Sequence, residues 1–267
     1  MAWREIFTMW RDVRMIAFTA LGAAVYVAVL LPFKGLVLIP GLTEVRPGAA
    51  IPIVLSFLFG PAAAWGAAFG NTLADVLGGT LTAGTFFGFF GNFLYGYLPY
   101  SLWRAVMGQK NPVRSGARGW AVYFVVVLTS CLAIGSVVGW GLDILGLAPF
   151  AALGLIIAVN NFIAAAVIAT ILLLLLYHRA EGRGLLYHQI LEDEPGGFSG
   201  KKLSRYGVLA CLVGAALAFA SGMVISGEVL GAGYGAAALS GAAKGAGSVL
   251  FGLTPGLTLL ILGALLL

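Results

Sequence analysis

The feature that most constrains this chain is a series of apolar runs, several of them about 20 residues long, separated by short polar stretches. A run of that length crosses the hydrocarbon core of a bilayer when it forms an α-helix. Only 9% of the 267 residues are charged and 61% are hydrophobic, whereas a soluble domain has roughly 25% charged residues. A water-soluble fold could not bury so many apolar side chains. The sequence therefore predicts an all-α integral membrane protein.

The apolar runs predict six membrane spans followed by about two more. The first group comprises residues 15–31, 49–59, 62–77, 84–103, 120–142 and 149–177. The second group, 206–225 and 249–267, follows the one sizeable hydrophilic stretch of the sequence. We therefore divide the chain into an N-terminal interfacial amphipathic segment at 1–14, a six-span core at 15–177, a cytoplasmic polar loop at 178–205 and a C-terminal transmembrane hairpin at 206–267.

The N-terminal segment combines aromatic and charged residues. At helical spacing Trp3, Ile6, Phe7 and Trp10 share one face, which is typical of a short helix lying in the headgroup layer. The simpler interpretation is an anchor that flanks the first span.

Lysine and arginine set the expected orientation, because short cytoplasmic loops of membrane proteins are enriched in them. With a cytoplasmic N-terminus, all of the 15 basic residues except Lys34, Arg46 and Lys244 fall on the cytoplasmic side. This arrangement requires the short run 49–59 to cross the membrane, since otherwise the basic loop after Trp103 would lie outside. We expect a multi-pass protein of a prokaryotic cytoplasmic membrane. The net charge of +5 reflects these loops and does not indicate a nucleic-acid partner.

Polar side chains within the spans are candidate ligand-binding groups, because lipid cannot pair them and they must face the bundle interior or a cavity. Asn71 and Asp75 are four residues apart and share a helix face. Asn92 and Asn161 are further candidates. The alternative for the asparagines is hydrogen bonding between helices, and for Asp75 a position at the membrane interface.

The loop after the first span ends with Glu44 and Arg46, which would stand at the outer mouth of the bundle. Pro47 suits the first turn of the next helix, where its missing N–H has no partner to lose. Tyr95 and Trp140 could stack on a planar ligand, or they could belong to the aromatic belts of the membrane interfaces.

Catalytic signatures are missing from the sequence. Both histidines, His178 and His188, lie in the polar loop, and there is no P-loop and no H-E-x-x-H motif. Cys131 and Cys211 fall inside spans and form no C-x-x-C pair. We therefore expect no enzyme activity, no catalytic residue, no metal and no cofactor.

The first span carries a stripe of small residues, Ala20, Ala24 and Ala28, at positions i, i+4 and i+8. Such a stripe lets another helix approach closely. That helix could belong to this chain or to a partner protein.

Several motifs resemble one transporter family. They are the acidic-x-Arg-Pro sequence at 44–47, the turn "LFGP" at 58–61, "GNTLADVLGG" at 70–79 and the "GN" pair at 91–92. Together they resemble the S components of energy-coupling factor (ECF) transporters, and most closely the queuosine-precursor type. The resemblance covers residues 15–177 and implies a six-helix S-component-like bundle, to which this chain adds its C-terminal hairpin.

The resemblance implies the high-affinity substrate-binding subunit of an ECF-type ABC importer. Such a subunit captures a vitamin or related micronutrient at the outer face and releases it inward with a T component and two ABC ATPases. The loop after the first span would cover the pocket, and Asn92, Trp140 and Asn161 are pocket candidates by position. Ala20, Ala24 and Ala28 would contact the T component.

Two other functions remain open from the residues alone. A stand-alone secondary transporter or channel would usually show repeated halves, and the sequence has no convincing repeat. A structural or assembly subunit of a larger membrane complex would use the C-terminal hairpin for docking. We expect the hairpin to pack toward lipid without a ligand role.

Overall fold

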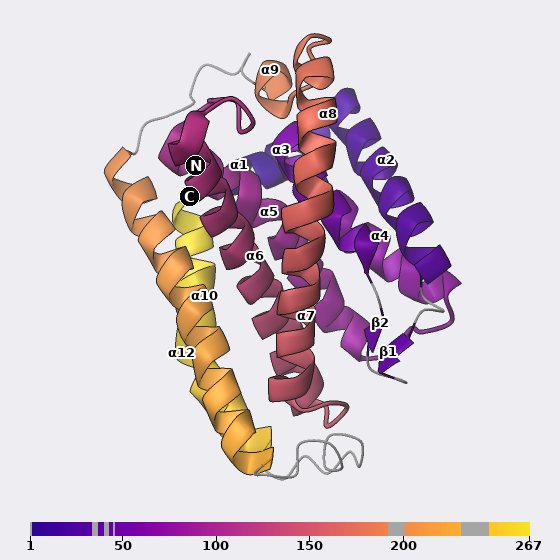
Figure 1. Cartoon of the computed structure of the whole chain (residues 1–267), viewed down its shortest axis with the longest axis vertical. Helices are drawn as coiled ribbons and strands as arrows, with labels where there is room; N and C mark the ends of the chain where they lie inside the picture. Colours follow the sequence, from indigo (N-terminus) through magenta and orange to yellow (C-terminus); the bar gives the residue numbers. More distant parts are fainter. Residues whose placement is uncertain (1, 34–36, 40–42, 45, 192–200, 231–245) are drawn as a thin grey trace.

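The protein is described by a computed structural model over residues 2–33, 37–39, 43–44, 46–191, 201–230 and 246–267 (Figure 1). Among these residues, five helical segments are long and apolar enough to cross a membrane: Val13–Phe33, Gly116–Ile144, Phe150–Glu181, Ser204–Ser226 and Val249–Leu266. The chain is therefore a helical, multi-pass membrane protein, as the sequence predicts.

Each apolar run of the sequence contains a helix. The first group comprises α2 (Val13–Leu30), α3 (Ala50–Phe59), α4 (Pro61–Leu77), α5 (Gly84–Met107), α6 (Gly116–Ile144) and α7 (Phe150–Ala164), which continues through the π-helical segment η4 (Ala165–Ala169) into α8 (Thr170–Glu181). The second comprises α10 (Lys201–Leu230) and α12 (Ala246–Leu266). The short elements are α1 (Ala2–Thr8), η1 (Met9–Arg11), η2 (Leu31–Phe33), β1 (Val37–Ile39), β2 (Thr43–Glu44), η3 (Pro47–Ala49) and α9 (Tyr187–Leu191).

The short helix α3 is buried on almost every side. All of its residues except Ile51 are buried. A helix that is apolar all round belongs in a core, so α3 is covered by protein rather than by lipid. It ends at Gly60, whose φ of 52° favours glycine, and α4 begins at the next residue, Pro61. The ring of Tyr187 packs against Gly60, which leaves no room for a side chain there.

Helix α2 presents two different faces. Its inner face packs on α4, where Gly66 and Gly70 lie against the carbonyl oxygens of Thr19 and Ala23. The alanine stripe lies on the other face, and Ala20, Ala24 and Ala28 are all exposed. The stripe is therefore left uncovered by the part of the chain that the structure describes.

The C-terminal helices α10 and α12 pack on each other through glycines. A Cβ added at Gly214 would meet the backbone of Leu260, and one added at Gly256 would meet the backbone of Ala218. The pair packs against α6 and α7 and lies on the opposite side of the molecule from α2 (Figure 1). The hydroxyl of Tyr97 on α5 donates to the carbonyl of Ala264 on α12 at 2.8 Å. The hairpin is thus tightly docked on the first group of helices.

The N-terminal segment is anchored to the rest of the protein. Ile6 and Met9 are buried, whereas Phe7, expected on the same face as Ile6, is exposed. The indole of Trp65 donates to the carbonyl of Ile6 at 2.9 Å. Glu5 pairs with Arg104 on α5 at 2.7 Å. These contacts turn Ile6 inward and leave Phe7 pointing away.

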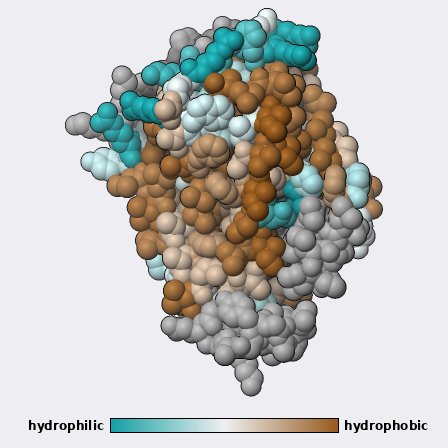
Figure 2. All heavy atoms as spheres, in the orientation of Figure 1, coloured by the Kyte–Doolittle hydropathy of each residue, from teal (hydrophilic) through white to brown (hydrophobic). Residues whose placement is uncertain are grey.

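Hydrophilic residues gather at one end of the molecule, the end at which α8 ends and α9 lies (Figure 2). The Glu5–Arg104 pair ties the N-terminal segment to the end of α5. Asn111, just after α5, donates to Glu181 at the end of α8 at 3.4 Å. We name this the basic end, because the N-terminal segment and the two stretches from the end of α5 to the start of α6 and from the end of α8 to the start of α10 carry most of the chain's lysines and arginines. Their grouping agrees with the positive-inside arrangement.

Candidate substrate site

Asp75 is the centre of a polar group at the end opposite the basic end, which we name the outer end. It lies near the end of α4 and is only partly buried. Its carboxylate accepts hydrogen bonds from Thr85 at 3.0 Å, from Thr80 at 3.3 Å and from Asn71 at 3.4 Å. Three donors from α4, from the connection and from α5 therefore hold one acidic side chain in place.

A second polar group lies deeper, between α2 and α5. The hydroxyl of Tyr26 donates to Oδ1 of Asn92 at 2.9 Å, and Nδ2 of Asn92 donates to the carbonyl of Gly88 at 2.9 Å. Tyr26 and Asn92 are both buried. A Cβ at Gly88 would come within 2.9 Å of Nδ2 of Asn71, so this glycine lets the α4 amide approach α5.

The polar residues of α5 share one side of that helix. Thr85, Gly88, Asn92 and Tyr95 follow one another at spacings of three and four, which places them along a single stripe. The stripe meets Asn71 and Asp75 of α4 and Tyr26 of α2.

Arg46 and the short strands lie at the same end. Arg46 is partly buried and directly precedes η3. The segment η3 contacts α2, the helix that carries Tyr26. Strands β1 and β2 pair antiparallel, with Val37 opposite Glu44, and β2 and η3 both contact α7. The side chain of Glu44 lies outside the described residues.

Tyr95 and Asn161 are in contact across the bundle. The hydroxyl of Tyr95 donates to the backbone carbonyl of Asn161 at 3.4 Å, and the thiol of Cys131 donates to that hydroxyl at 3.9 Å. All three residues are buried. This contact links α5, α6 and α7 next to the polar stripe.

Trp140 does not join the other candidates. It packs edge-on against Phe87 with ring centroids 5.9 Å apart, and it lines an apolar groove between α5, α6 and α12. Phe87 lies on a different side of α5 from Asn92, because five residues correspond to about 500° of helix. The structure therefore brings Asn71 and Asp75 of α4 beside the stripe of α5 on which Asn92 meets Tyr26, places Arg46 at the same end, and leaves Trp140 apart.

Sequence reasoning missed Tyr26, Thr80 and Thr85. A signal for Tyr26 was present, since it is the only residue with a polar side chain between Thr19 and the end of the first span. A buried tyrosine hydroxyl needs a hydrogen-bond partner. The threonines follow Asp75 in a glycine-rich turn, where hydroxyls often bond to nearby groups.

This arrangement suits a small polar ligand. A guanidinium offers donors, a carboxylate offers acceptors, and amides and hydroxyls offer both. Such groups between apolar helices are typical of a ligand site in which a few polar contacts set the specificity. We name Arg46, Asn71, Asp75 and Asn92, together with Tyr26 and Thr85, the outer polar cluster.

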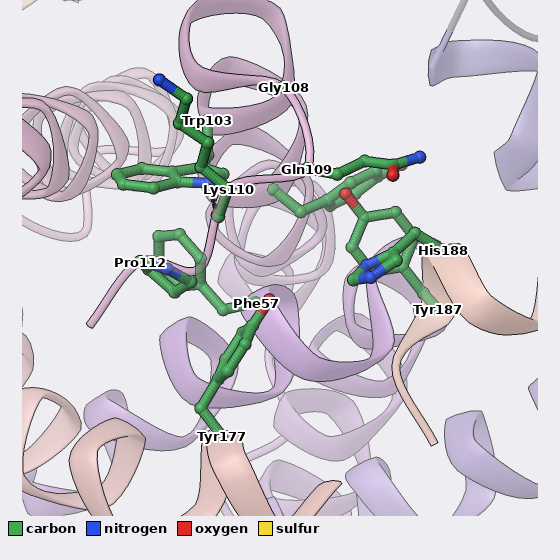
Figure 3. Close-up of a pocket in the computed structure, with 10 residues that line it drawn as sticks. Phe57, Trp103, Gly108, Gln109, Lys110, Pro112, Tyr177, Tyr187 and His188 are labelled. Atoms are coloured by element: carbon green, nitrogen blue, oxygen red, sulfur yellow. Dashed lines mark hydrogen bonds between the residues drawn. The ribbon is translucent and has the colours of Figure 1, made fainter. Parts of the chain in front are cut away.

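A small pocket also lies at the basic end, between Phe57, Trp103, Lys110, Tyr177 and Tyr187 (Figure 3). Its volume is about 10 Å³, which is close to the space that one water molecule needs. The indole of Trp103 donates to the carbonyl of Lys110 at 2.9 Å and thereby closes the turn after α5. This pocket has no room for a substrate of the size of a vitamin.

Comparison with known proteins identifies the chain. A family model described as the QueT transporter matches residues 16–178, which is more than half of the chain. The match begins near the start of α2, ends within α8 and leaves the C-terminal hairpin outside. No curated protein and no solved structure matches the chain. The matched region contains the entire outer polar cluster. The chain therefore belongs to the QueT transporter family, a family of ECF S components for queuosine precursors.

Proposed function

We propose that this chain is the high-affinity substrate-binding subunit of an ECF-type ABC importer and that the outer polar cluster binds its substrate. Family membership supports an S component for substrate uptake. The observation that carries the assignment of the site is the hydrogen-bonded contact of Tyr26 with Asn92 beside Asn71 and Asp75. The substrate is a vitamin or related micronutrient, and a queuosine precursor is the first to test.

The cluster is organised to recognise a polar molecule without a large net charge. Arg46 and Asp75 supply opposite charges at its outer edge, and the amides of Asn71 and Asn92 lie deeper. Their hydrogen bonds to Thr85, Tyr26 and Gly88 keep the acidic and amide groups oriented before a ligand enters. Groups that are already oriented lose less entropy on binding. Glu44, at the end of β2, belongs to the segment that would cover this site.

The proposed partners are a T component and two ABC ATPases. The exposed stripe of Ala20, Ala24 and Ala28 on α2 supports a helix–helix contact with the T component. The opposite side of the first helix group is occupied by α10 and α12. The exposed face of α2 carries small residues, whereas the exposed face of α7 and α8 carries large ones such as Ile163 and Leu175, so α2 is the face that suits close backbone approach.

The direct test is substrate binding by the purified full-length chain in detergent. We expect tight binding of a queuosine precursor by calorimetry. We expect Asn92→Ala to weaken it about tenfold, the loss expected when a buried polar partner is left unpaired. The control is Ser101→Ala, which removes a buried hydroxyl that bonds to the carbonyl of Tyr97 further along the same helix.

Two outcomes would contradict the proposal. If Asn92→Ala retains full affinity while remaining folded, the outer polar cluster does not bind the substrate. If cells that lack a T component and the ATPases take up the substrate through this chain, it acts as a stand-alone transporter. Mass spectrometry of small molecules that co-purify with the chain would identify the substrate if it is not a queuosine precursor.

A further inference from the structure

An apolar groove of about 470 Å³ lies between α5, α6 and α12, and α1 closes one of its ends. It is formed by the docking of α12, so it lies where the C-terminal hairpin meets the region that the family model covers. Its side chains are almost entirely hydrocarbon and aromatic. They include Phe87, Phe90, Leu94, Trp140, Leu257 and Ile261.

The groove opens toward the bilayer. Phe90 and Ile261, which line it, are both about half exposed. Along α5 it extends from Phe86 to Tyr97, a rise of roughly 16 Å. The hydrocarbon core of a bilayer is about 30 Å thick, and one acyl chain spans about half of it, so a single acyl chain is long enough to fill this stretch of the groove. The substance available to fill an apolar groove at this depth is lipid hydrocarbon.

A positive charge stands at the basic end of the groove. Trp3 and Ile6 of α1 line that end, and the guanidinium of Arg4 lies 5.8 Å from the ring centroid of Trp3. Arg4 is exposed. The neighbouring carboxylate of Glu5 is bound to Arg104 at 2.7 Å, so it does not neutralise Arg4 directly.

We infer that this groove binds one acyl chain of an anionic phospholipid from the leaflet at the basic end, with its headgroup at Arg4. An arginine near the membrane surface attracts an anionic lipid by about 1 kcal/mol, which corresponds to about fivefold in affinity. The groove supplies the apolar contact along the chain, and Trp140 contributes an aromatic wall at its far end. The bound lipid fills the space between α12 and α5 beside the Tyr97–Ala264 hydrogen bond.

The test uses the purified full-length chain in vesicles of equal phosphatidylglycerol and phosphatidylethanolamine, followed by native mass spectrometry of the lipids that stay bound. We expect one lipid per chain with phosphatidylglycerol preferred. Ile261→Trp fills the groove from an exposed position and should remove the bound lipid. The matched control, Ile163→Trp, adds the same bulk at an exposed position of α7 outside the groove and should retain it.

Arg4→Gln should lower the preference for phosphatidylglycerol about fivefold while phosphatidylethanolamine binding stays unchanged. Arg183→Gln removes an exposed arginine beyond α8 at the same end and is the control for general surface charge. Unchanged lipid retention in Ile261→Trp overturns the groove assignment, and unchanged preference in Arg4→Gln overturns the headgroup assignment. A chain that is dimeric until Ile261→Trp separates it would show that a second copy fills the groove instead.

Discussion

At the scale of single residues, Tyr26 explains how a polar site is built into an apolar helix. Its ring fills space against α4, and its hydroxyl reaches Asn92 on α5. The sequence predicts that such a hydroxyl needs a partner, but 66 positions separate the two residues. Only the packing of α2 and α5 on α4 determines which asparagine it meets. By contrast, the proximity of Asn71 and Asp75 follows from a spacing of four and was predictable.

Tyr26→Phe should weaken both the fold and substrate binding. The change leaves Oδ1 of buried Asn92 without its tyrosine donor, and interhelical hydrogen bonds in membrane proteins contribute roughly 0.6–2 kcal/mol. We expect a lower melting temperature in detergent and a several-fold loss of substrate affinity, measured by thermal shift and calorimetry.

Tyr95→Phe is the matched control for that change. The Tyr95 hydroxyl bonds at 3.4 Å to the carbonyl of Asn161, which also accepts the backbone N–H of Ala165. Its loss should therefore cost less than the loss of the Tyr26 hydroxyl. Equal effects of the two variants would contradict the role assigned to the Tyr26–Asn92 contact.

At the scale of elements, the helices were largely predictable and their contacts were not. Apolar runs mark helices because a spanning segment must satisfy its backbone internally. The helices extend past the predicted runs, as α6 does from residue 120 back to Gly116, because their ends carry polar residues that hydropathy does not count. The strand pair β1–β2 lay in a stretch expected only as a loop. The docking of α10 and α12 depends on which faces meet, and the apolar content of each helix does not encode this.

Ala24→Trp should prevent assembly with a T component without changing substrate binding. Ala24 is exposed on the outer face of α2, and a bulky ring there would keep another helix from approaching closely. The readout is co-purification of the T component and ATPases with tagged chain. Ala216→Trp, at an exposed alanine of α10, should leave the complex intact. Loss of the complex in both variants, or in neither, would argue against α2 as the partner face.

Gly256→Ala should loosen the C-terminal hairpin. The added methyl would meet the backbone of Ala218, which cannot move aside as a flexible side chain can. Overpacking of this kind costs roughly 1–3 kcal/mol. Thermal unfolding in detergent should therefore begin at a lower temperature than in Ala220→Val, which adds bulk at an exposed position of α10. A melting temperature equal to that of the unmodified chain would show that the helices are not in close contact here.

At the scale of the whole molecule, the two sides of the first helix group have different surroundings. One side presents the small residues of α2, and the other is covered by α10 and α12 (Figure 1). Basic residues gather at one end and the outer polar cluster at the other. Charge counting could predict the two ends, because it depends only on the order of loops. It could not predict the two sides, because these depend on how the helices are arranged around the bundle.

The proposed orientation can be checked with single cysteines. Leu145→Cys, in the turn after α6, should react with a membrane-impermeant maleimide in intact cells, and Gln109→Cys, after α5, should react only after permeabilisation. Both positions are exposed, and the native cysteines Cys131 and Cys211 are buried and should stay unlabelled. The reverse pattern would place the basic end outside the cell and overturn the orientation.

The π-helical segment η4 joins α7 to α8. It determines how far α7 is rotated about the helix axis relative to α8. The backbone N–H of Thr170 bonds to the carbonyl of Ala165, five residues back rather than four, so the segment holds one additional residue. Each residue of an α-helix turns the chain by about 100°. If α8 kept its place and the additional residue were removed, Asn161 would rotate by about that angle away from Tyr95. One additional residue in η4 thus determines which side of α7 faces Tyr95.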